Sequence, residues 1–144
     1  MRLSDLDMVL TVEHQGYDYP WSRRIFEDCL RIGYCCLVAE IDGEVVGHGL
    51  MMVRAGEAHI LNICVDPAAR RRGVAWALLE ALLEVAVEAG AETAFLEVRA
   101  SNKGAISLYD QANFQCVGQR KDYYPAPFGR EDAVVMAREL ALPA

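Results

Sequence analysis

The segment between residues 59 and 90 constrains the fold most, because an apolar strand leads there through a basic turn into an apolar helix. Residues 59–65 are almost continuously apolar, which is typical of a strand at the centre of a sheet. Residues 74–89 have the length of a helix, their glutamates recur every fourth position, and Gly90 ends them. We therefore expect this helix to be buried on most of its circumference against the sheet.

The segments on either side predict an alternation of strands and helices. Helical spacing from Leu6 to Glu13 predicts a helix over residues 4–16, and a second one is expected from Trp21 to about Leu30. The Asp42-Gly43 dipeptide predicts a hairpin. Further strands are expected at 34–41, 44–53, 94–98, 114–120 and 133–140, and a further helix at 102–112. This order predicts one α/β domain over residues 1–144, a mixed sheet with helices on both faces.

Charge and cysteine content argue against several classes of protein. A formal net charge of −7 over 144 residues disfavours a nucleic-acid-binding protein, because binding phosphates needs a basic surface. Five cysteines without C-x-x-C spacing are typical of reduced thiols in a cytoplasmic protein. No signal peptide or apolar run of about 20 residues is recognisable, so no membrane association is expected. The histidines stand apart without H-E-x-x-H spacing, so no metal ion is expected.

The basic turn Arg70-Arg71-Arg72-Gly73-Val74-Ala75 is a candidate phosphate site. A helix start presents unpaired N–H groups and a partial positive charge, and both favour phosphate. Gly73 has no Cβ and so allows close approach of the backbone to a ligand. The turn matches neither G-x-G-x-x-G nor G-x-x-x-x-G-K-[ST], which leaves a pyrophosphate of another kind. A solvated basic turn is the alternative interpretation.

Glu97 and Tyr109 are candidate catalytic residues. Glu97 is a carboxylate within an apolar strand, where it needs a partner or a function. Tyr109 belongs to the helix that follows this strand, so both side chains could face one cleft. A carboxylate can accept a proton from an amine, and a tyrosine hydroxyl can give a proton to a leaving thiolate. The alternatives are a salt-bridged glutamate, with Arg99 as a potential partner, and a core tyrosine.

The basic turn and the strand end before it, Val65-Asp66-Pro67 followed by Arg70-x-x-Gly73-x-Ala75, resemble a family signature. This signature is the acyl-CoA-binding motif of the GCN5-related N-acetyltransferases (GNAT). The resemblance implies that the amides of residues 70–75 hold the pyrophosphate of acetyl-CoA. It also implies that the backbone of Ile63, Cys64 and Val65 pairs with the pantetheine arm. The implied sheet is mostly antiparallel, splays near the end of the strand at 59–65, and begins with a first strand of only residues 1–3.

Further motifs are similar to those of the bacterial ribosomal-protein alanine N-acetyltransferases within GNAT. They are Pro20-Trp21-Ser22, Leu96-Glu97-Val98-Arg99-Ala100-Ser101-Asn102, Tyr123-Tyr124-Pro125 and Gly129-Arg130-Glu131-Asp132-Ala133. The resemblance implies that Glu97 is the general base, that Tyr109 is the general acid and that Asn102 contacts the coenzyme. The implied acceptor is the N-terminal alanine of a small-subunit ribosomal protein.

The acceptor site is less sharply defined by the sequence. The resemblance favours Trp21, Tyr124 and Asp132 as acceptor-binding residues, although the aromatic residues could equally belong to the core. Two positions depart from the family pattern, since Asn113 replaces a usual glycine and Arg70 stands where glutamine is common. An acetyltransferase of small amines or lysine side chains, or a non-catalytic acyl-CoA-binding domain, would also fit the phosphate site.

Overall fold

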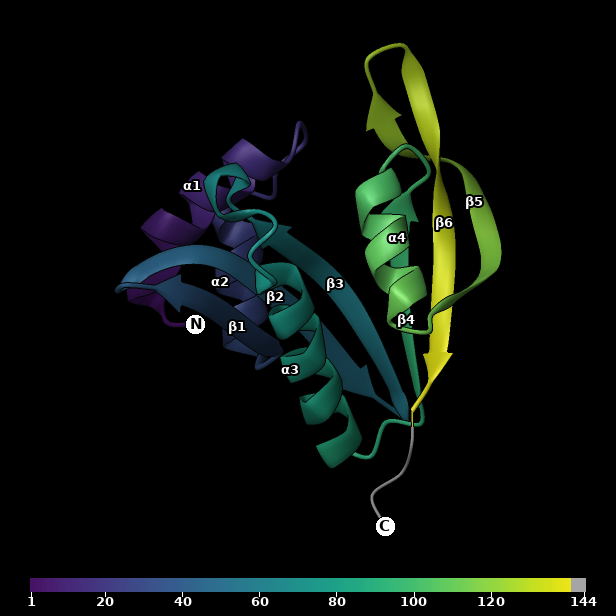
Figure 1. The fold of residues 1–144 in the computed structure, drawn as a ribbon, viewed down its shortest axis with the longest axis horizontal. Coiled ribbons are helices and arrows are strands. Elements are labelled where there is room, and N and C mark those ends of the chain that lie inside the picture. Colours follow the sequence, from purple (N-terminus) through teal and green to yellow (C-terminus); the bar gives the residue numbers. More distant parts are fainter. Residues whose placement is uncertain (141–144) are drawn as a thin grey trace.

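The computed structural model describes residues 1–140, in which six strands form one mixed sheet with the order β1-β2-β3-β4-β6-β5 (Figure 1). Neighbouring strands pair antiparallel except β3 and β4, which are parallel, so the expected mostly antiparallel sheet is confirmed. The strands are β1 (Cys35–Ile41), β2 (Glu44–Arg54), β3 (Glu57–Val65), β4 (Thr93–Arg99), β5 (Gln115–Ala126) and β6 (Gly129–Glu139).

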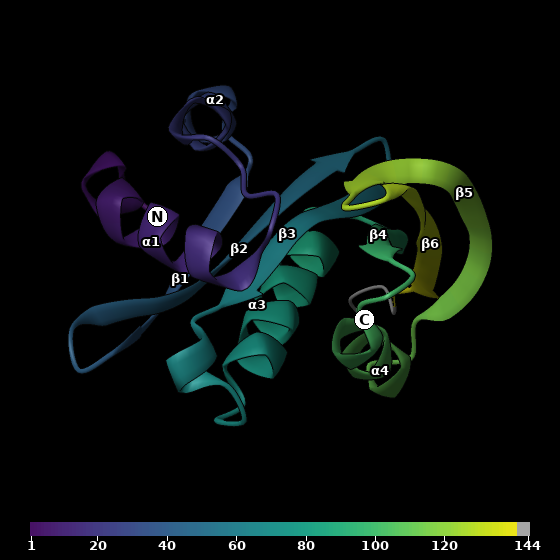
Figure 2. The same cartoon turned by 90° about the horizontal axis from the view of Figure 1, so that it is seen from above.

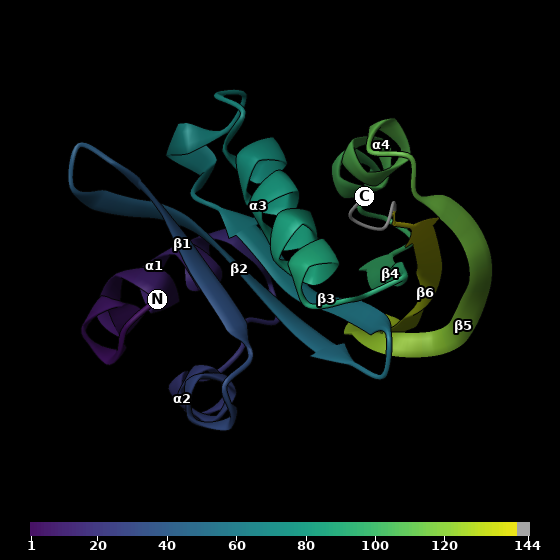
Figure 3. The same ribbon diagram turned by 90° about the horizontal axis from the view of Figure 1, so that it is seen from below.

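Helices cover both faces of the sheet, as predicted. The helices α1 (Leu6–Gly16) and α2 (Arg23–Ile32) lie on one face, and α3 (Val74–Glu88) and α4 (Lys103–Gln111) lie on the other (Figures 2 and 3). Two short 3-10 helices, η1 (Leu3–Asp5) and η2 (Pro67–Ala69), precede α1 and α3. No helix within residues 1–140 has the length and apolar character that crossing a membrane requires.

Three expectations from the sequence were wrong in detail. Residues 1–3 form no strand; the Asp5 carboxylate accepts the Arg2 N–H at 2.7 Å, which closes a turn into η1. Residues 130–132 do not precede the last strand but lie within β6, because its ladder with β5 continues to Gly129. The helix α3 is buried on one face only, and Trp76 is 38% exposed on the other.

The centre of the sheet opens, as expected from the resemblance. The strands β3 and β4 pair only from Glu57 with Thr93 to Ile60 with Leu96, and they diverge beyond this point (Figure 1). The divergence begins at a β-bulge, since Met51 pairs with Ile60 and Leu50 pairs with Asn62, which leaves Leu61 as an extra residue. One extra residue reverses the alternation of side chains. Ile60 therefore packs in the core beside α3, whereas Asn62 faces α1.

The core has one part on each face of the sheet. The larger part contains Leu79, Leu82 and Phe114, and the smaller part, under α1 and α2, contains Leu6 and Phe26. Two glycines of β2 allow α3 to lie close to the sheet. A Cβ on Gly47 would lie 3.2 Å from Leu78, and one on Gly49 would lie 3.1 Å from Leu82.

Candidate active site

A cavity of about 300 Å³ occupies the opening between β3 and β4. Its walls come from α1 and the loop after it, from the diverging ends of β3 and β4, from α4 and its N-cap, and from β5. Six of the residues predicted for the site line it, namely Trp21, Ile63, Glu97, Asn102, Tyr109 and Tyr124. The divergence of two neighbouring strands thus brings the candidate base and acid to one space.

Glu97 faces this cavity and is also ion-paired. Its side chain is 28% exposed, and its Oε1 lies 3.0 Å from Nε of Arg120 in β5. A side-chain hydrogen bond to this carboxylate raises the pKa of Tyr123. The partner of Glu97 is therefore Arg120 and not Arg99, and the pairing leaves the carboxylate at the cavity wall.

Tyr109 lines the same cavity from α4, with only 7% of its surface exposed. Its ring packs edge-on against Phe114, with the ring centroids 5.9 Å apart. Burial, with a smaller contribution from Tyr124, raises the pKa of Tyr109 to about 12, so the hydroxyl holds its proton at neutral pH. The turn after α4 accommodates the Asn113 substitution, because asparagine tolerates the left-handed φ of 68° better than most residues.

The basic turn forms an exposed helix start. The first backbone bond of α3 runs from the Ala77 N–H to the Gly73 carbonyl at 3.0 Å, so the amides of residues 74–76 have no acceptor within the helix. Gly73 has a φ of 76°, and a Cβ built there would meet no atom within 4 Å. The side chains of residues 70–72 are exposed, and none of them pairs with a carboxylate in the described part of the chain. Free amides, open space and unpaired arginines suit a pyrophosphate.

The end of β3 leads from the cavity to this turn. Beyond Ile60 it has no pairing with β4, which leaves one backbone edge without a neighbouring strand. The Ile63 carbonyl accepts the hydroxyl of Tyr17 at 2.6 Å, and burial raises the pKa of Tyr17 well above its usual value. The side chain of Cys64 turns toward α1, where burial raises its pKa to about 12, so only its backbone can face a ligand in the opening.

Two further predicted residues, Asn102 and Asp132, accept hydrogen bonds from backbone N–H groups. The Asn102 Oδ1 accepts the Ala105 N–H at 3.2 Å and so caps α4 at the cavity. Asp132 does not line the cavity. Its Oδ1 instead accepts the Asp122 N–H at 3.0 Å, which holds an irregular stretch of β5 just before Tyr123 and Tyr124.

A buried polar cluster was missed from the sequence, although two of its residues, Glu13 and Asn62, line the cavity. Glu13 is 1% exposed, its Oε1 lies 2.9 Å from His48 Nε2, and both its oxygens accept hydrogen bonds from Asn62 at 3.0 and 3.2 Å. The Trp21 N–H donates to the same carboxylate at 3.0 Å, so Glu13 fastens the loop after α1 to the sheet. The available signal was the position of Glu13, which continues the apolar spacing of Leu6 and Val9.

The same cluster is the one group of described residues that could surround a metal ion. The ligand atoms of Glu13, His48 and Cys64 lie within 4.8 Å of one another, and all three side chains are buried. Both oxygens of Glu13 already accept N–H donors, and the thiol of Cys64 approaches the Val12 carbonyl at 3.6 Å. This donor set forms a hydrogen-bonded network that ties α1 to β2 and β3.

A splayed sheet, with a helix start of free amides at one end of the opening and a carboxylate and a tyrosine hydroxyl inside it, is the arrangement that an acyl-CoA-dependent transferase requires. Comparisons with known proteins agree. The profile of the Acetyltransferase (GNAT) family matches residues 4–114. The [ribosomal protein bS18]-alanine N-acetyltransferase of Escherichia coli K12 is 34% identical over 142 residues, which cover 99% of this chain and 96% of that protein.

A solved structure extends the comparison to the whole fold. The chain superposes on the crystal structure of the ribosomal-protein-S18-alanine N-acetyltransferase from Escherichia coli with a TM-score of 0.92 and 34% sequence identity. The superposition covers 100% of this chain and 93% of that chain. The enzyme of the same description from Salmonella typhimurium is 35% identical over 139 residues, covering 96% of this chain and 94% of that protein. The chain belongs to the GNAT family of acetyltransferases and is an acetyl-CoA-dependent N-acetyltransferase.

Proposed function

We propose that the protein acetylates the N-terminal alanine of ribosomal protein bS18. The observation that carries the proposal is the 34% identity to the Escherichia coli enzyme, because it extends over 99% of this chain. It therefore includes the β5–β6 hairpin, which lies outside the family match at 4–114 and whose Tyr124 lines the cavity.

The phosphate-binding turn supports acetyl-CoA as the donor. The amides of residues 74–76 and the arginines at 70–72 would hold the pyrophosphate, and the open edge of β3 at Ile63 and Val65 would pair with the pantetheine arm. Acetyl-CoA supplies the acetyl group as a thioester. Asn102, which caps α4 beside the cavity, would contact the coenzyme.

Two residues of the cavity would handle the protons. The attacking amine must be neutral, and an α-amino group, with an ordinary pKa near 8, needs less help than lysine near 10.4. Glu97 accepts the proton of the amine, directly or through one water, and the pair with Arg120 holds the carboxylate at the cavity wall. The hydroxyl of Tyr109, which burial keeps protonated, donates to the departing sulfur. Direct attack requires no covalent intermediate on the enzyme.

The acceptor site would be shaped by Trp21 and Tyr124 directly and by Asp132 indirectly. Trp21 lines the cavity from the loop after α1, and Tyr124 lines it from β5. Asp132 acts at one remove, through the β5 segment that it holds. A small first side chain such as alanine would suit a cavity of about 300 Å³ that must also admit the thioester.

The test is an acetylation assay on a peptide with the bS18 N-terminal sequence, a free N-terminal alanine and an internal lysine. Fragmentation in the mass spectrometer locates the acetyl group, and a peptide with a blocked N-terminus is the control. We expect labelling of the α-amino group alone. Labelling of the lysine alone would favour the lysine acetyltransferase, whereas acetylation of small amines but neither peptide would favour the small-amine enzyme.

A further inference from the structure

Arg99 is the last residue of β4 and joins the hairpin to the cavity wall. It lies two residues after Glu97, and residues two apart in a strand share a face. Its Nη1 donates to the Pro125 carbonyl at 2.7 Å and to Glu131 Oε1 at 3.0 Å. The other carboxylate oxygen of Glu131 accepts the Ser101 N–H at 3.2 Å. These bonds fix the guanidinium to both strands of the β5–β6 hairpin.

Two tyrosines from different walls of the cavity meet at the same guanidinium. Its central carbon lies 5.0 Å from the ring centroid of Tyr19, in the loop after α1, and 4.6 Å from that of Tyr124, in β5. Both distances are in the range of favourable cation–π contacts. All three residues line the cavity. Arg99 thus connects a loop near the N-terminus to a hairpin more than 100 residues later in the chain.

The distance from Glu97 to Arg99 along β4 suggests which acceptor residues lie near this contact. Two residues along a strand span about 7 Å. An extended peptide whose amine lies at Glu97 would advance by a similar distance over its first two residues. The second or third residue of the acceptor would then lie between the walls that Arg99 connects.

We propose that Arg99 is a positioning residue that sets the width of the acceptor entrance by holding Tyr19 and Tyr124 together. The proposal rests on the proposed function, since it requires that the acceptor is the end of a peptide chain. Arg99 acts through the two rings, so its loss weakens binding of the peptide and leaves the reaction of bound peptide largely intact.

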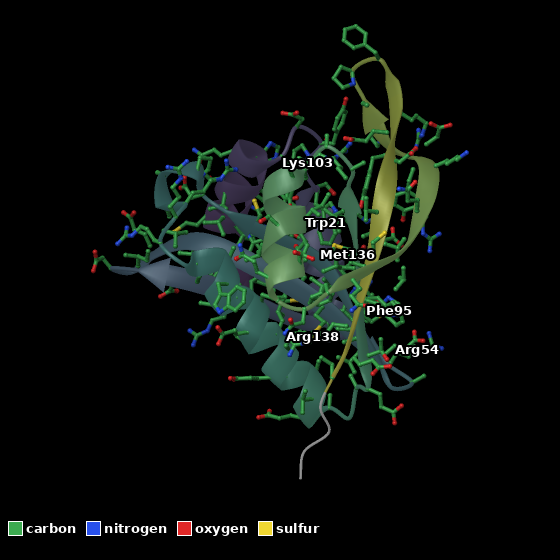
Figure 4. All side chains as sticks on the ribbon, turned by 45° about the vertical axis from the view of Figure 1, so that its right-hand side comes forward. Trp21, Arg54, Phe95, Lys103, Met136 and Arg138 are labelled. Atoms are coloured by element: carbon green, nitrogen blue, oxygen red, sulfur yellow. The ribbon has the colours of Figure 1, made fainter. Side chains whose placement is uncertain are left out.

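The test compares Arg99→Met, Tyr19→Ala and the double variant with the wild type, using a peptide with a free N-terminal alanine. We expect each single variant to raise the KM for the peptide about tenfold, between the scales of an exposed and a desolvated cation–π contact, because the Arg99 side chain is 23% exposed. The kcat and the KM for acetyl-CoA should change less than about twofold. The double variant should be no worse than either single one, because both remove the same contact. Arg54→Met is the matched control, since it removes an exposed arginine at the distant end of β2 (Figure 4).

An unchanged KM for the peptide in Arg99→Met would overturn the proposal, as would fully additive effects of the two substitutions. If Arg99→Met does not fold, Glu131→Gln decides, because it weakens the anchor of the guanidinium without lining the cavity. A raised KM for the peptide would then support the proposal, and an unchanged one would overturn it. If the wild type does not acetylate the peptide, both the proposed acceptor and the role of Arg99 are refuted. If the wild type acetylates the peptide and Arg99→Met leaves the KM unchanged, only the role of Arg99 is refuted.

Discussion

Replacing Gly73 by alanine tests whether the turn before α3 holds the pyrophosphate. Gly73 has a φ of 76°, and a non-glycine residue in this left-handed conformation costs about 1–2 kcal/mol. For a chain of 144 residues this lowers the melting temperature by roughly 3–8 °C. The new Cβ would point into space with no protein atom within 4 Å, beside the amides of residues 74–76. The loss of one charge-assisted hydrogen bond there would weaken binding of coenzyme A by about 10–100-fold.

Gly56→Ala separates strain from obstruction. Gly56 has nearly the same conformation, with a φ of 79° and no atom within 4 Å of a built Cβ. It lies in the turn between β2 and β3. The basic turn at residues 70–75 follows the other end of β3, where Val65 pairs with Gly47. Both variants should therefore lose similar thermal stability, and only Gly73→Ala should lose affinity.

The assay is isothermal titration with coenzyme A, together with thermal unfolding of each variant. Wild-type affinity in a folded Gly73→Ala protein would show that the phosphates bind elsewhere. An equal loss of affinity in both variants would show that strain, and not the blocked approach to the amides, causes the defect.

Three of the four further predictions concern the cavity, and the fourth concerns two cysteines outside it. Glu97→Gln should retain binding of coenzyme A and lower kcat by about 100-fold. The loss of kcat should shrink as the pH rises toward and above the α-amino pKa near 8, because the amine then loses its proton unaided. A loss of kcat that does not depend on pH would leave Glu97 a positioning role only. Tyr109→Phe should lower kcat by a similar factor with little change in melting temperature, and an unchanged kcat would remove this hydroxyl from the mechanism. Because the pKa of Tyr109 is raised to about 12, wild-type activity should not decline through loss of its proton below about pH 11, which a pH–rate profile can check. Iodoacetamide at pH 8 should modify the exposed Cys116 well before Cys64, because a pKa raised to about 12 keeps Cys64 a thiol. Mass spectrometry of the early products would refute this order if it showed that Cys64 reacted first.

Much of the fold followed from local patterns. The Asp42-Gly43 turn, the helix from Val74 and the apolar strand that precedes it depend on conformational preferences and spacing within short segments, and all three are present. The parts that were wrong lie where local preference is weak. The start of the chain is held by a hydrogen bond that the N-terminal ammonium group of Met1 donates to the Cys36 carbonyl at 2.9 Å. The strand β6 begins earlier than expected because it pairs with β5 as far as Gly129.

The candidate site was predicted in part. The turn at 70–75, Glu97 and Tyr109 could be identified because their residue types and spacing form motifs, and the structure brings the last two to one cavity. Their roles in catalysis remain predictions. The partners of these residues could not be read from spacing, since Arg120 reaches Glu97 from a strand whose position depends on the sheet order.

The sequence by itself determined most of the segments that become strands and helices, where a helix start offers free amides, and which family the chain belongs to, because these depend on neighbouring residues. Only the tertiary structure decided which side chains meet. One extra residue at Leu61 turns Asn62 toward Glu13, and the sheet order brings Tyr124 to Arg99, which also meets Tyr19 from the other wall. Such contacts join residues tens of positions apart, so they depend on register and packing across the whole sheet and leave no local pattern in the chain.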